Sequence, residues 1–205
     1  MARAFSGGER DRIDGKLREE AARRFGSGGC RKTTVDELAQ AAGISKGAFY
    51  LFYPSKEALF YRVLMDYHAR VRTTLIERID AAAAGPEGLR PSDIADALVL
   101  AFREVESSFL PASLADGELE YLSSRLDEAV LASHQADDGD MVSAVFTRLP
   151  GLGETDMAFW GAMLRGIFTL TLHRREIGEP YYGRVVETMI RQTVAAMTAP
   201  KDGSL

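Results

Sequence analysis

Apolar residues recur at intervals of three and four along nearly the whole chain, and this spacing limits the folds open to it. The first instance runs from Ile13 through Leu17 and Ala21 to Phe25, with charged residues between them. Because an α-helix repeats about every 3.6 residues, this spacing gathers the apolar side chains on one helical face. No stretch shows the sustained period-two alternation of a half-buried strand. The sequence therefore predicts an all-α protein.

Glycine, proline and capping residues divide this pattern into about nine helices. The glycine run at 26–29 is expected to end the first helix. Thr34, with Glu37 three residues later, has the spacing of a capping box that opens the second. A third helix is expected over 46–53, because Pro54 stops it. Long helices are expected over 55–84, 154–175 and 181–198.

Charge divides the chain unevenly. Residues 1–56 carry 11 Lys+Arg against 7 Asp+Glu, whereas residues 57–205 carry 14 against 23. The net charges of +4 and −9 together give the −5 of the whole chain. A basic head on an acidic body indicates that the head meets a polyanion. We therefore expect a nucleic-acid-binding head over 1–56 and a separate helical body over 57–205, which the charge gives no reason to place on the polyanion.

Other classes of protein lack their signatures here. The single cysteine, Cys30, excludes an internal disulfide framework. His68, His134 and His173 are isolated from one another, so no metal-ligand spacing is present, and no nucleotide or cofactor motif occurs. Apolar runs such as 97–102 fall far below the roughly 18 residues of a membrane span, and no signal peptide is recognisable. The expectation is a cytoplasmic protein that is not an enzyme and holds no metal or cofactor.

Residues 34–53 have the pattern of a helix-turn-helix unit. Gly43 supplies a residue that tolerates positive φ at the turn. Phe49 and Tyr53 lie four residues apart and would share the face of the second helix that packs on the rest of the head. The opposite face of that helix is then directed outward.

This outward face would carry Tyr50, Leu51 and Phe52, a costly surface for a protein that meets no partner. A DNA major groove is about 12 Å wide and admits one helix, in which Lys46 would contact guanine and apolar side chains thymine methyls. Hydroxyls and an ammonium nearby would bind phosphates. The alternative is that the aromatics form a buried core face. The candidate DNA-binding residues are Thr33, Thr34, Ser45, Lys46, Gly47, Ala48, Tyr50, Leu51, Phe52 and Lys56.

Three segments resemble the TetR/AcrR family of bacterial regulators: TTVDELA at 33–39, AGISKGAFY at 42–50 and YPSKEAL at 53–59. The resemblance covers roughly residues 10–65. It implies a three-helix DNA-binding head, an all-helical regulatory body, and a homodimer on a palindromic operator. It further implies repression relieved by a small molecule, with Thr33 and Thr34 near the DNA backbone and Tyr50 and Lys56 as phosphate anchors. Phe52 stands where many members carry a polar or tyrosine side chain.

The two closing helices are the candidates for dimerisation. The stretch 157–172 is apolar or small at nearly every position, and a helix that is apolar all round is buried on more than one side. The last helix carries a wide apolar seam, so the pair is expected to form a four-helix bundle with a second copy. A purely intramolecular core is the alternative. The candidate interface residues are Met157, Leu164, Phe168, Tyr182, Val186, Met189, Ile190 and Val194.

A set of large, adaptable side chains in the body could line a cavity for a small apolar or amphipathic ligand. Periodicity alone does not separate a cavity from ordinary core packing. The candidate ligand-binding residues are Phe102, Phe109, Met141, Phe146, Phe159, Trp160, Met163 and Phe168.

Together these patterns favour a ligand-responsive homodimeric transcriptional repressor. It would bind a palindromic double-stranded operator through the helix 46–53 and leave it when a small molecule enters the body. The alternative is an all-α small-molecule binding protein or enzyme whose head recruits a partner other than DNA.

Overall fold

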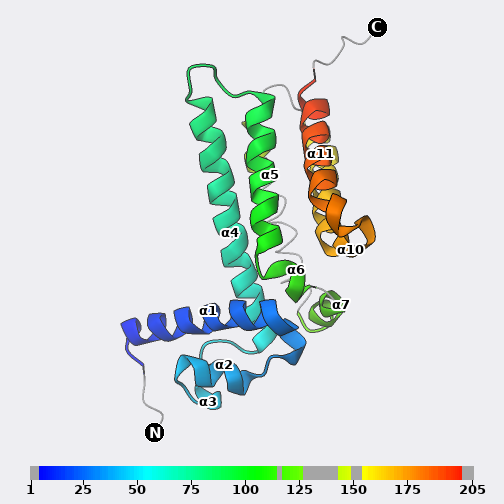
Figure 1. The fold of residues 1–205 in the computed structure, drawn as a ribbon. Coiled ribbons are helices and arrows are strands. Elements are labelled where there is room, and N and C mark those ends of the chain that lie inside the picture. The colour runs from blue at the N-terminus through cyan, green and yellow to red at the C-terminus, as the bar shows by residue number, and fades with distance from the viewer. Residues whose placement is uncertain (1–4, 115–116, 127–142, 149–153, 200–205) are drawn as a thin grey trace. The chain divides into compact units, whose positions relative to one another are not determined.

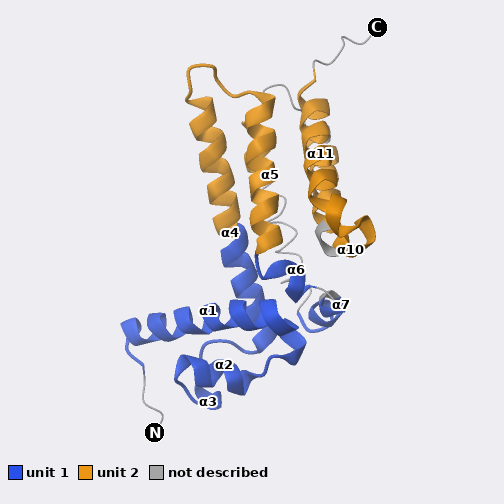
Figure 2. Cartoon of the chain, in the orientation of Figure 1, with its two compact units in different colours: residues 1–68, 108–131 blue, residues 69–107, 132–205 orange. Residues whose placement is uncertain are grey.

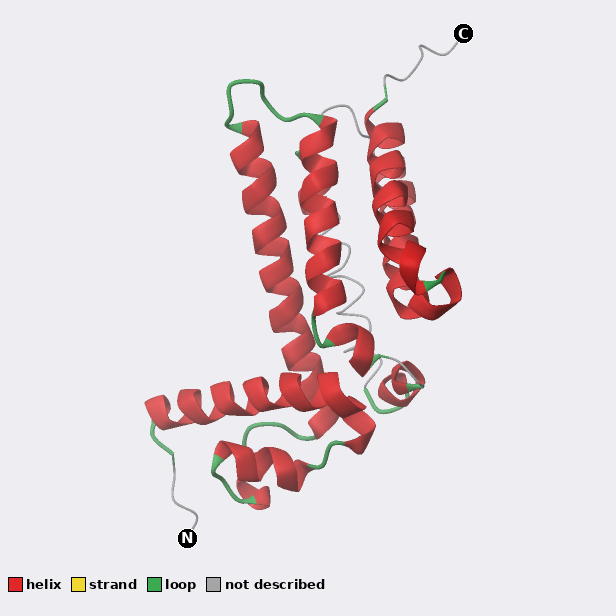
Figure 3. Cartoon of the chain, viewed as in Figure 1, coloured by secondary structure: helices red, strands yellow, loops and turns green. Residues whose placement is uncertain are grey.

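The computed structural model describes residues 5–114, 117–126, 143–148 and 154–199. Over these residues every regular element is helical (Figure 3), which confirms the predicted all-α class. No helix in these ranges is long and apolar enough to cross a membrane. The described elements, most of which are labelled in Figure 1, are α1 (Gly7–Lys32), α2 (Val35–Ala42), α3 (Lys46–Phe49), α4 (Lys56–Ala83), α5 (Pro91–Ser107), α6 (Leu110–Ser113), α7 (Glu118–Ser123), α9 (Glu154–Thr169), η1 (Leu170–His173), α10 (Arg174–Ile177) and α11 (Glu179–Thr198).

The chain forms two compact units (Figure 2). Unit 1 comprises Met1–His68 and Ser108–Leu131, and unit 2 comprises Ala69–Ser107 and Ala132–Leu205. This division differs from the predicted domains 1–56 and 57–205. The first part of α4 belongs to unit 1, and α6 and α7 return to it because they pack on α1.

The core of unit 1 lies along α1. Ile13, Leu17, Ala21 and Phe25 are all buried, as their spacing predicts. α6 comes close to α1 at Gly26, where an added Cβ would lie 2.8 Å from the Cβ of Phe109. Gly26 is therefore required for this close contact between α1 and α6.

α1 does not end at the start of the glycine run, as expected, but continues to Lys32. Within the run only Gly29 leaves the helical region, with φ of 80°, so the helix is kinked there. The contacts of α6 and α7 with α1 outweigh the low helix propensity of the other glycines.

Unit 2 packs α11 against α5 and α9. Here the structure corrects the predicted dimer seam, because Tyr182, Val186, Ile190 and Val194 are buried within their own unit and are not available to a second copy. The periodicity identified a seam but not the helix that it faces. Of the remaining candidates, Met157, Leu164 and Phe168 are half-buried, and Met189 is exposed.

The closing helices differ from their predicted bounds. The expected helix 154–175 ends at Thr169 and continues as the 3₁₀ element η1 and the short α10. α11 begins at Glu179 with a proline in its first turn, where the missing N–H breaks no helical hydrogen bond.

Candidate nucleic-acid interface

The turn between α2 and α3 has the expected geometry. Thr34 caps α2 by accepting the N–H of Glu37 at 3.2 Å, and Glu37 accepts the N–H of Thr34 at 2.8 Å in return. Gly43 ends α2 with φ of 75°, and the hydroxyl of Ser45 accepts the N–H of Ala48 at 3.2 Å to open α3. Each side-chain bond satisfies a backbone donor that the helix start leaves open.

Phe49 and Tyr53 anchor the second helix from beneath, as predicted. Phe49 is fully buried, and the Tyr53 hydroxyl donates to Asp14 of α1 at 2.5 Å. Burial and this hydrogen bond to a carboxylate raise the pKa of Tyr53 above its ordinary value, so the phenol remains a donor. The orientation of α3 relative to α1 is therefore set by both packing and a polar contact.

α3 is shorter than the predicted helix 46–53, since its α-helical part ends at Phe49. Beyond that point Leu51 donates to Ala48 at 3.1 Å and Phe52 donates to Phe49 at 2.9 Å, the tighter spacing of a 3₁₀ turn. The Tyr53 N–H still donates to the Phe49 carbonyl at 3.1 Å, and Pro54 then favours an extended conformation at Tyr53, so the helix does not continue.

The outward face of this segment is exposed, as predicted. Tyr50 is 50% exposed and Leu51 is 54% exposed, among the largest exposures of big apolar side chains in the described residues. Lys46 and Gly47 are exposed beside them, and Ala48 is half-buried. This surface is apolar at its centre and is bordered by a cation.

Lys46 pairs with Asp36 of α2 at 2.7 Å. The hydrogen bond to that carboxylate raises the pKa of Lys46. Both side chains are more than half exposed, so water screens the ion pair. The Lys46 ammonium can therefore leave Asp36 for another acceptor at a small cost in free energy.

Phe52 is only half-buried, and other residues of the head contact it. The ring of Phe5 lies 5.8 Å from the Phe52 ring, and the Arg10 guanidinium lies 4.9 Å above it. Arg10 also donates to the Leu51 carbonyl at 3.1 Å. Phe52 therefore joins the start of the chain to the turn after α3.

The structure gives two predicted phosphate ligands different roles. Thr33 is buried, and its hydroxyl donates to the Gly29 carbonyl at 2.9 Å. The ammonium of Lys56 donates to the carbonyls of Cys30, Arg31 and Thr33 at 2.8, 2.9 and 2.8 Å. Because an ammonium has three hydrogens, none is left for a phosphate in this arrangement. Thr34 remains exposed at the start of α2.

Sequence reasoning missed Glu118 and Tyr121 of α7, which lie against the end of α1. Glu118 is 4% exposed and accepts the Arg31 N–H at 2.9 Å. The Lys56 ammonium lies 5.6 Å from the centre of the Tyr121 ring, and the Tyr121 hydroxyl donates to the buried carboxylate of Glu57. No short-range pattern marks these residues, since their partners are distant in the chain.

Two ionisable groups of the head have strongly altered acidity. Hydrogen bonds from Arg23 and Arg24 lower the pKa of Glu20 to about 2. Burial, together with the negative charge of Glu57, raises the pKa of the Cys30 thiol to about 12. Within the described ranges, no three His, Cys, Asp or Glu side chains come together as a metal site.

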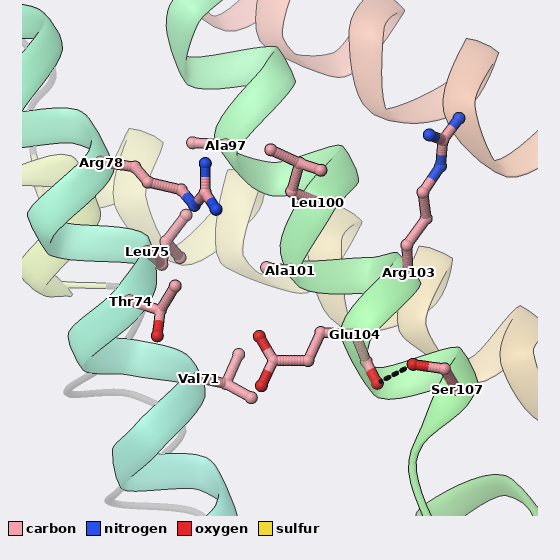
Figure 4. A pocket seen from close by; sticks show the side chains of 10 residues that line it. All are labelled: Val71, Thr74, Leu75, Arg78, Ala97, Leu100, Ala101, Arg103, Glu104 and Ser107. Carbon is pink, nitrogen blue, oxygen red and sulfur yellow. Dashed lines mark hydrogen bonds between the residues drawn. The ribbon is translucent and has the colours of Figure 1, made fainter.

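Unit 2 contains a groove of about 370 Å³ between α4 and α5 (Figure 4). Its floor is apolar, and Arg78 reaches toward it from α4. Within the described part of the chain Arg78 has no hydrogen-bonded or ion-paired partner, whereas Arg103 of α5 pairs with Glu187 at 2.9 Å. The lining residues are Val71, Thr74, Leu75, Arg78, Ala97, Leu100, Ala101, Arg103, Glu104 and Ser107.

None of the predicted ligand-binding residues lines this groove, because they occupy several different environments. Phe146 is buried in the core of unit 2, whereas Phe159 and Met163 are exposed. Phe109 belongs to unit 1, where its ring contacts those of Phe60 and Tyr67. Trp160, Phe102 and Phe168 are half-buried, and Met141 lies outside the described residues.

The family description "Bacterial regulatory proteins, tetR family" matches residues 17–63. The uncharacterized HTH-type transcriptional regulator YdgC of Bacillus subtilis is 31% identical over 90 residues, which cover 44% of each chain. YuxN of the same organism, described in the same words, is 41% identical over 58 residues, covering 28% of this chain and 20% of that protein. The chain thus spans less than half the length of these relatives.

Solved structures share the fold over nearly the whole chain. A TetR transcriptional regulator from Rhodococcus sp. RHA1 matches with a TM-score of 0.62 at 19% identity, covering 96% of this chain and 100% of that one. SmeT, the repressor of the Stenotrophomonas maltophilia multidrug efflux pump SmeDEF, matches with a TM-score of 0.61 at 15% identity, covering 93% and 91%. These likenesses establish a common architecture.

Proposed function

Because the chain belongs to the TetR family of bacterial regulatory proteins, we propose that it is a homodimeric transcriptional repressor released from a palindromic DNA operator by a small molecule. The observation that carries the proposal is the exposed surface of Lys46, Tyr50 and Leu51, on α3 and the turn that follows it. An apolar surface held in place by a buried neighbour such as Phe49 suits a partner that accepts one helix.

In the proposed complex, this surface of α3 enters the major groove. Lys46 leaves Asp36 for a base edge, and Leu51 contacts thymine methyls. The Tyr50 hydroxyl and Thr34 bind phosphates on either side. Thr33 and Lys56 contribute from inside the head by fixing the backbone that leads into α2.

The dimer is proposed to form through α9 and α11. Their exposed apolar side chains are Phe159 and Met163 on α9 and Tyr181 and Met189 on α11. These four replace the buried seam residues as the candidate interface, since they are accessible to a second copy. A two-fold interface of this kind would match the two-fold symmetry of a palindromic operator.

Substituting Phe159 tests this interface. The variant Phe159→Glu should sediment as a monomer, because a carboxylate would be buried without a partner. Leu100→Glu places the same charge on an exposed leucine of α5 and should remain a dimer. A dimer for both variants, or a monomeric native protein, contradicts the proposed interface.

The effector is proposed to bind the groove between α4 and α5. Its apolar floor and the exposed Arg78 suit a small amphipathic molecule with an anionic group. α4 is a single helix that contributes to both units, so a ligand that displaced α4 could act on the head. The ligand must bind the released state more tightly, since otherwise the equilibrium does not change.

Octanoate is a suitable probe for the groove. It should raise the melting temperature of the native protein and lower its affinity for DNA, while Arg78→Ala abolishes both effects. Octylammonium, which has the same chain and the opposite charge, should do neither. Equal responses to the two probes would rule out the anionic specificity of the groove but would leave DNA binding untouched.

DNA binding is tested by selecting duplexes from a random-sequence pool with the native protein. The enriched duplexes should be palindromic, with half-sites about 10 base pairs apart or a multiple of that spacing. Tyr50→Ala should lose this binding without a change in melting temperature, and Tyr50→Phe, which keeps the ring, should lose less. Failure of the native protein to enrich any sequence refutes the proposal and favours a head that recruits a different partner.

A further inference from the structure

The end of α1 is gripped by side chains of α7 and α4, and we propose that Glu118 of α7 is a positioning residue for DNA binding. It would fix the backbone 29–34 and thereby the placement of α2 and α3. This inference rests on the proposed function, but it concerns a helix outside the helix-turn-helix unit. Glu118, Tyr121, Lys56 and Glu57 are together called the latch.

The first component of the latch is steric. A Cβ built on Gly29 would lie 2.7 Å from Cδ and 2.8 Å from Oε1 of Glu118. The Glu118 side chain therefore occupies the space beside the kink that only glycine leaves open. Gly29 has φ of 80°, and with no Cβ it leaves room for the Glu118 carboxylate to pack against this backbone.

The second component is a hydrogen bond made possible by the kink. Glu118 accepts the Arg31 N–H at 2.9 Å, and the Arg31 guanidinium lies 3.5 Å from the same carboxylate. Because Glu118 is 4% exposed, water does not replace the carboxylate as an acceptor while the latch is closed. The negative charge strengthens the bond relative to a neutral acceptor.

The third component holds the carbonyls of the same stretch. Lys56 donates to three of them, and its ammonium lies over the Tyr121 ring. Tyr121 in turn donates to Glu57, the residue after Lys56. α7 thus contacts the backbone 29–33 directly through Glu118 and through Lys56 by way of Tyr121.

The fixed stretch leads straight into the DNA-binding elements. Thr33 donates to the Gly29 carbonyl, and the next residue, Thr34, caps α2. α2 packs against α3, so a change of backbone at Gly29 would move the start of α2 and with it the exposed surface of α3.

The test measures the latch and DNA binding separately. Cys30 is the single cysteine of the chain and is fully buried beside the latch carbonyls, so its reaction with iodoacetamide reports opening of this region. DNA affinity is measured with the duplex that the native protein selects from a random-sequence pool. The variants are Glu118→Ala and Glu118→Gln, and the control is Glu120→Ala, an exposed carboxylate on the same helix. All measurements are made well below each melting temperature.

Glu118→Ala should raise the rate of Cys30 modification and weaken DNA binding, each by at least about tenfold, which corresponds to about 1.4 kcal/mol. Glu118→Gln should change both by less, since its amide oxygen still accepts the Arg31 N–H. Glu120→Ala should change neither. If Glu118→Ala does not fold, the intermediate changes expected of Glu118→Gln decide the matter.

Several outcomes overturn the inference. Unchanged Cys30 reactivity in the Glu118 variants means that no latch closes over this region. Faster modification with native DNA affinity of the folded protein means that Glu118 serves stability alone. If the native protein enriches no DNA, the proposed function is wrong, and so is the role of Glu118 in DNA binding. The Cys30 measurement still shows whether the Glu118 variants open the backbone 29–34.

Discussion

Replacing Gly43 with valine tests the turn of the helix-turn-helix unit in isolation. Gly43 has φ of 75° and ψ of 32°, the left-handed helical region. A Cβ built there meets no heavy atom within 4 Å, so the Cβ itself adds no clash. The main effect is therefore expected to come from backbone conformation.

The expected magnitude follows from that geometry. A non-glycine residue in the left-handed region costs about 1–2 kcal/mol, and β-branching places valine at the upper end. The reduced freedom of the unfolded chain returns about 0.4–1 kcal/mol. We therefore expect Gly43→Val to lower the free energy of unfolding by about 1 kcal/mol. For a chain of this size, that is a fall of about 2–4 °C in melting temperature.

The assay is urea unfolding of Gly43→Val, Gly43→Asn and Gly15→Ala. Asparagine tolerates the left-handed region, so Gly43→Asn should lower the free energy of unfolding by clearly less than Gly43→Val does. Gly15 lies within α1 with open space beside it, and Gly15→Ala should be stabilised by about 0.5–1 kcal/mol. Equal losses for valine and asparagine, or a valine variant as stable as the native protein, would refute the conformational argument.

Three further predictions concern stability. Ile190→Ala should lower the free energy of unfolding by about 2–5 kcal/mol, because Ile190 is fully buried in the core of unit 2; a loss below about 1 kcal/mol in urea unfolding would contradict its placement. Glu20 has its pKa lowered to about 2 from 4.5, so the native state binds fewer protons than the unfolded state between these values. The native protein should therefore have a higher free energy of unfolding than Glu20→Gln above pH 4.5, and this difference should vanish as the pH falls toward 2. A difference in thermal unfolding that stays constant with pH would exclude the pairing with Arg23. Cys30 has its pKa raised from 9.0 to about 12, so the unfolded thiol ionises first and stability should fall as pH rises from 9 to 12. Cys30→Ala should lose less stability over that interval, and parallel curves for the two proteins would refute the burial of the thiol.

Local features of the head could be predicted from the sequence because the residues concerned are neighbours. The capping box of Thr34 and Glu37, the left-handed Gly43 and the buried Phe49 all follow from spacings of a few residues. The hydrogen bond between Arg31 and Glu118 joins positions 87 residues apart, and no periodicity indicates it. Contacts of this kind are identified only from the three-dimensional structure.

The seam of α11 shows a different reason for error. Its apolar spacing predicts a covered face, and Tyr182, Val186, Ile190 and Val194 all lie on a buried face. Helical periodicity states that a face is covered but not whether α5 or a second copy covers it. In the same way, the sequence predicts Lys56 as a phosphate ligand, because charge alone does not distinguish a phosphate from the backbone carbonyls that Lys56 binds.

Unit 1 is assembled from two stretches of chain with α5 between them, and this has a consequence for exchanging parts among related regulators. A chimera joined at a single point after α4 would combine the α1 of one parent with the α6 and α7 of another. Gly26 would then face a foreign side chain in place of Phe109, and Gly29 would face one in place of Glu118. A functional graft of this head must carry both stretches together.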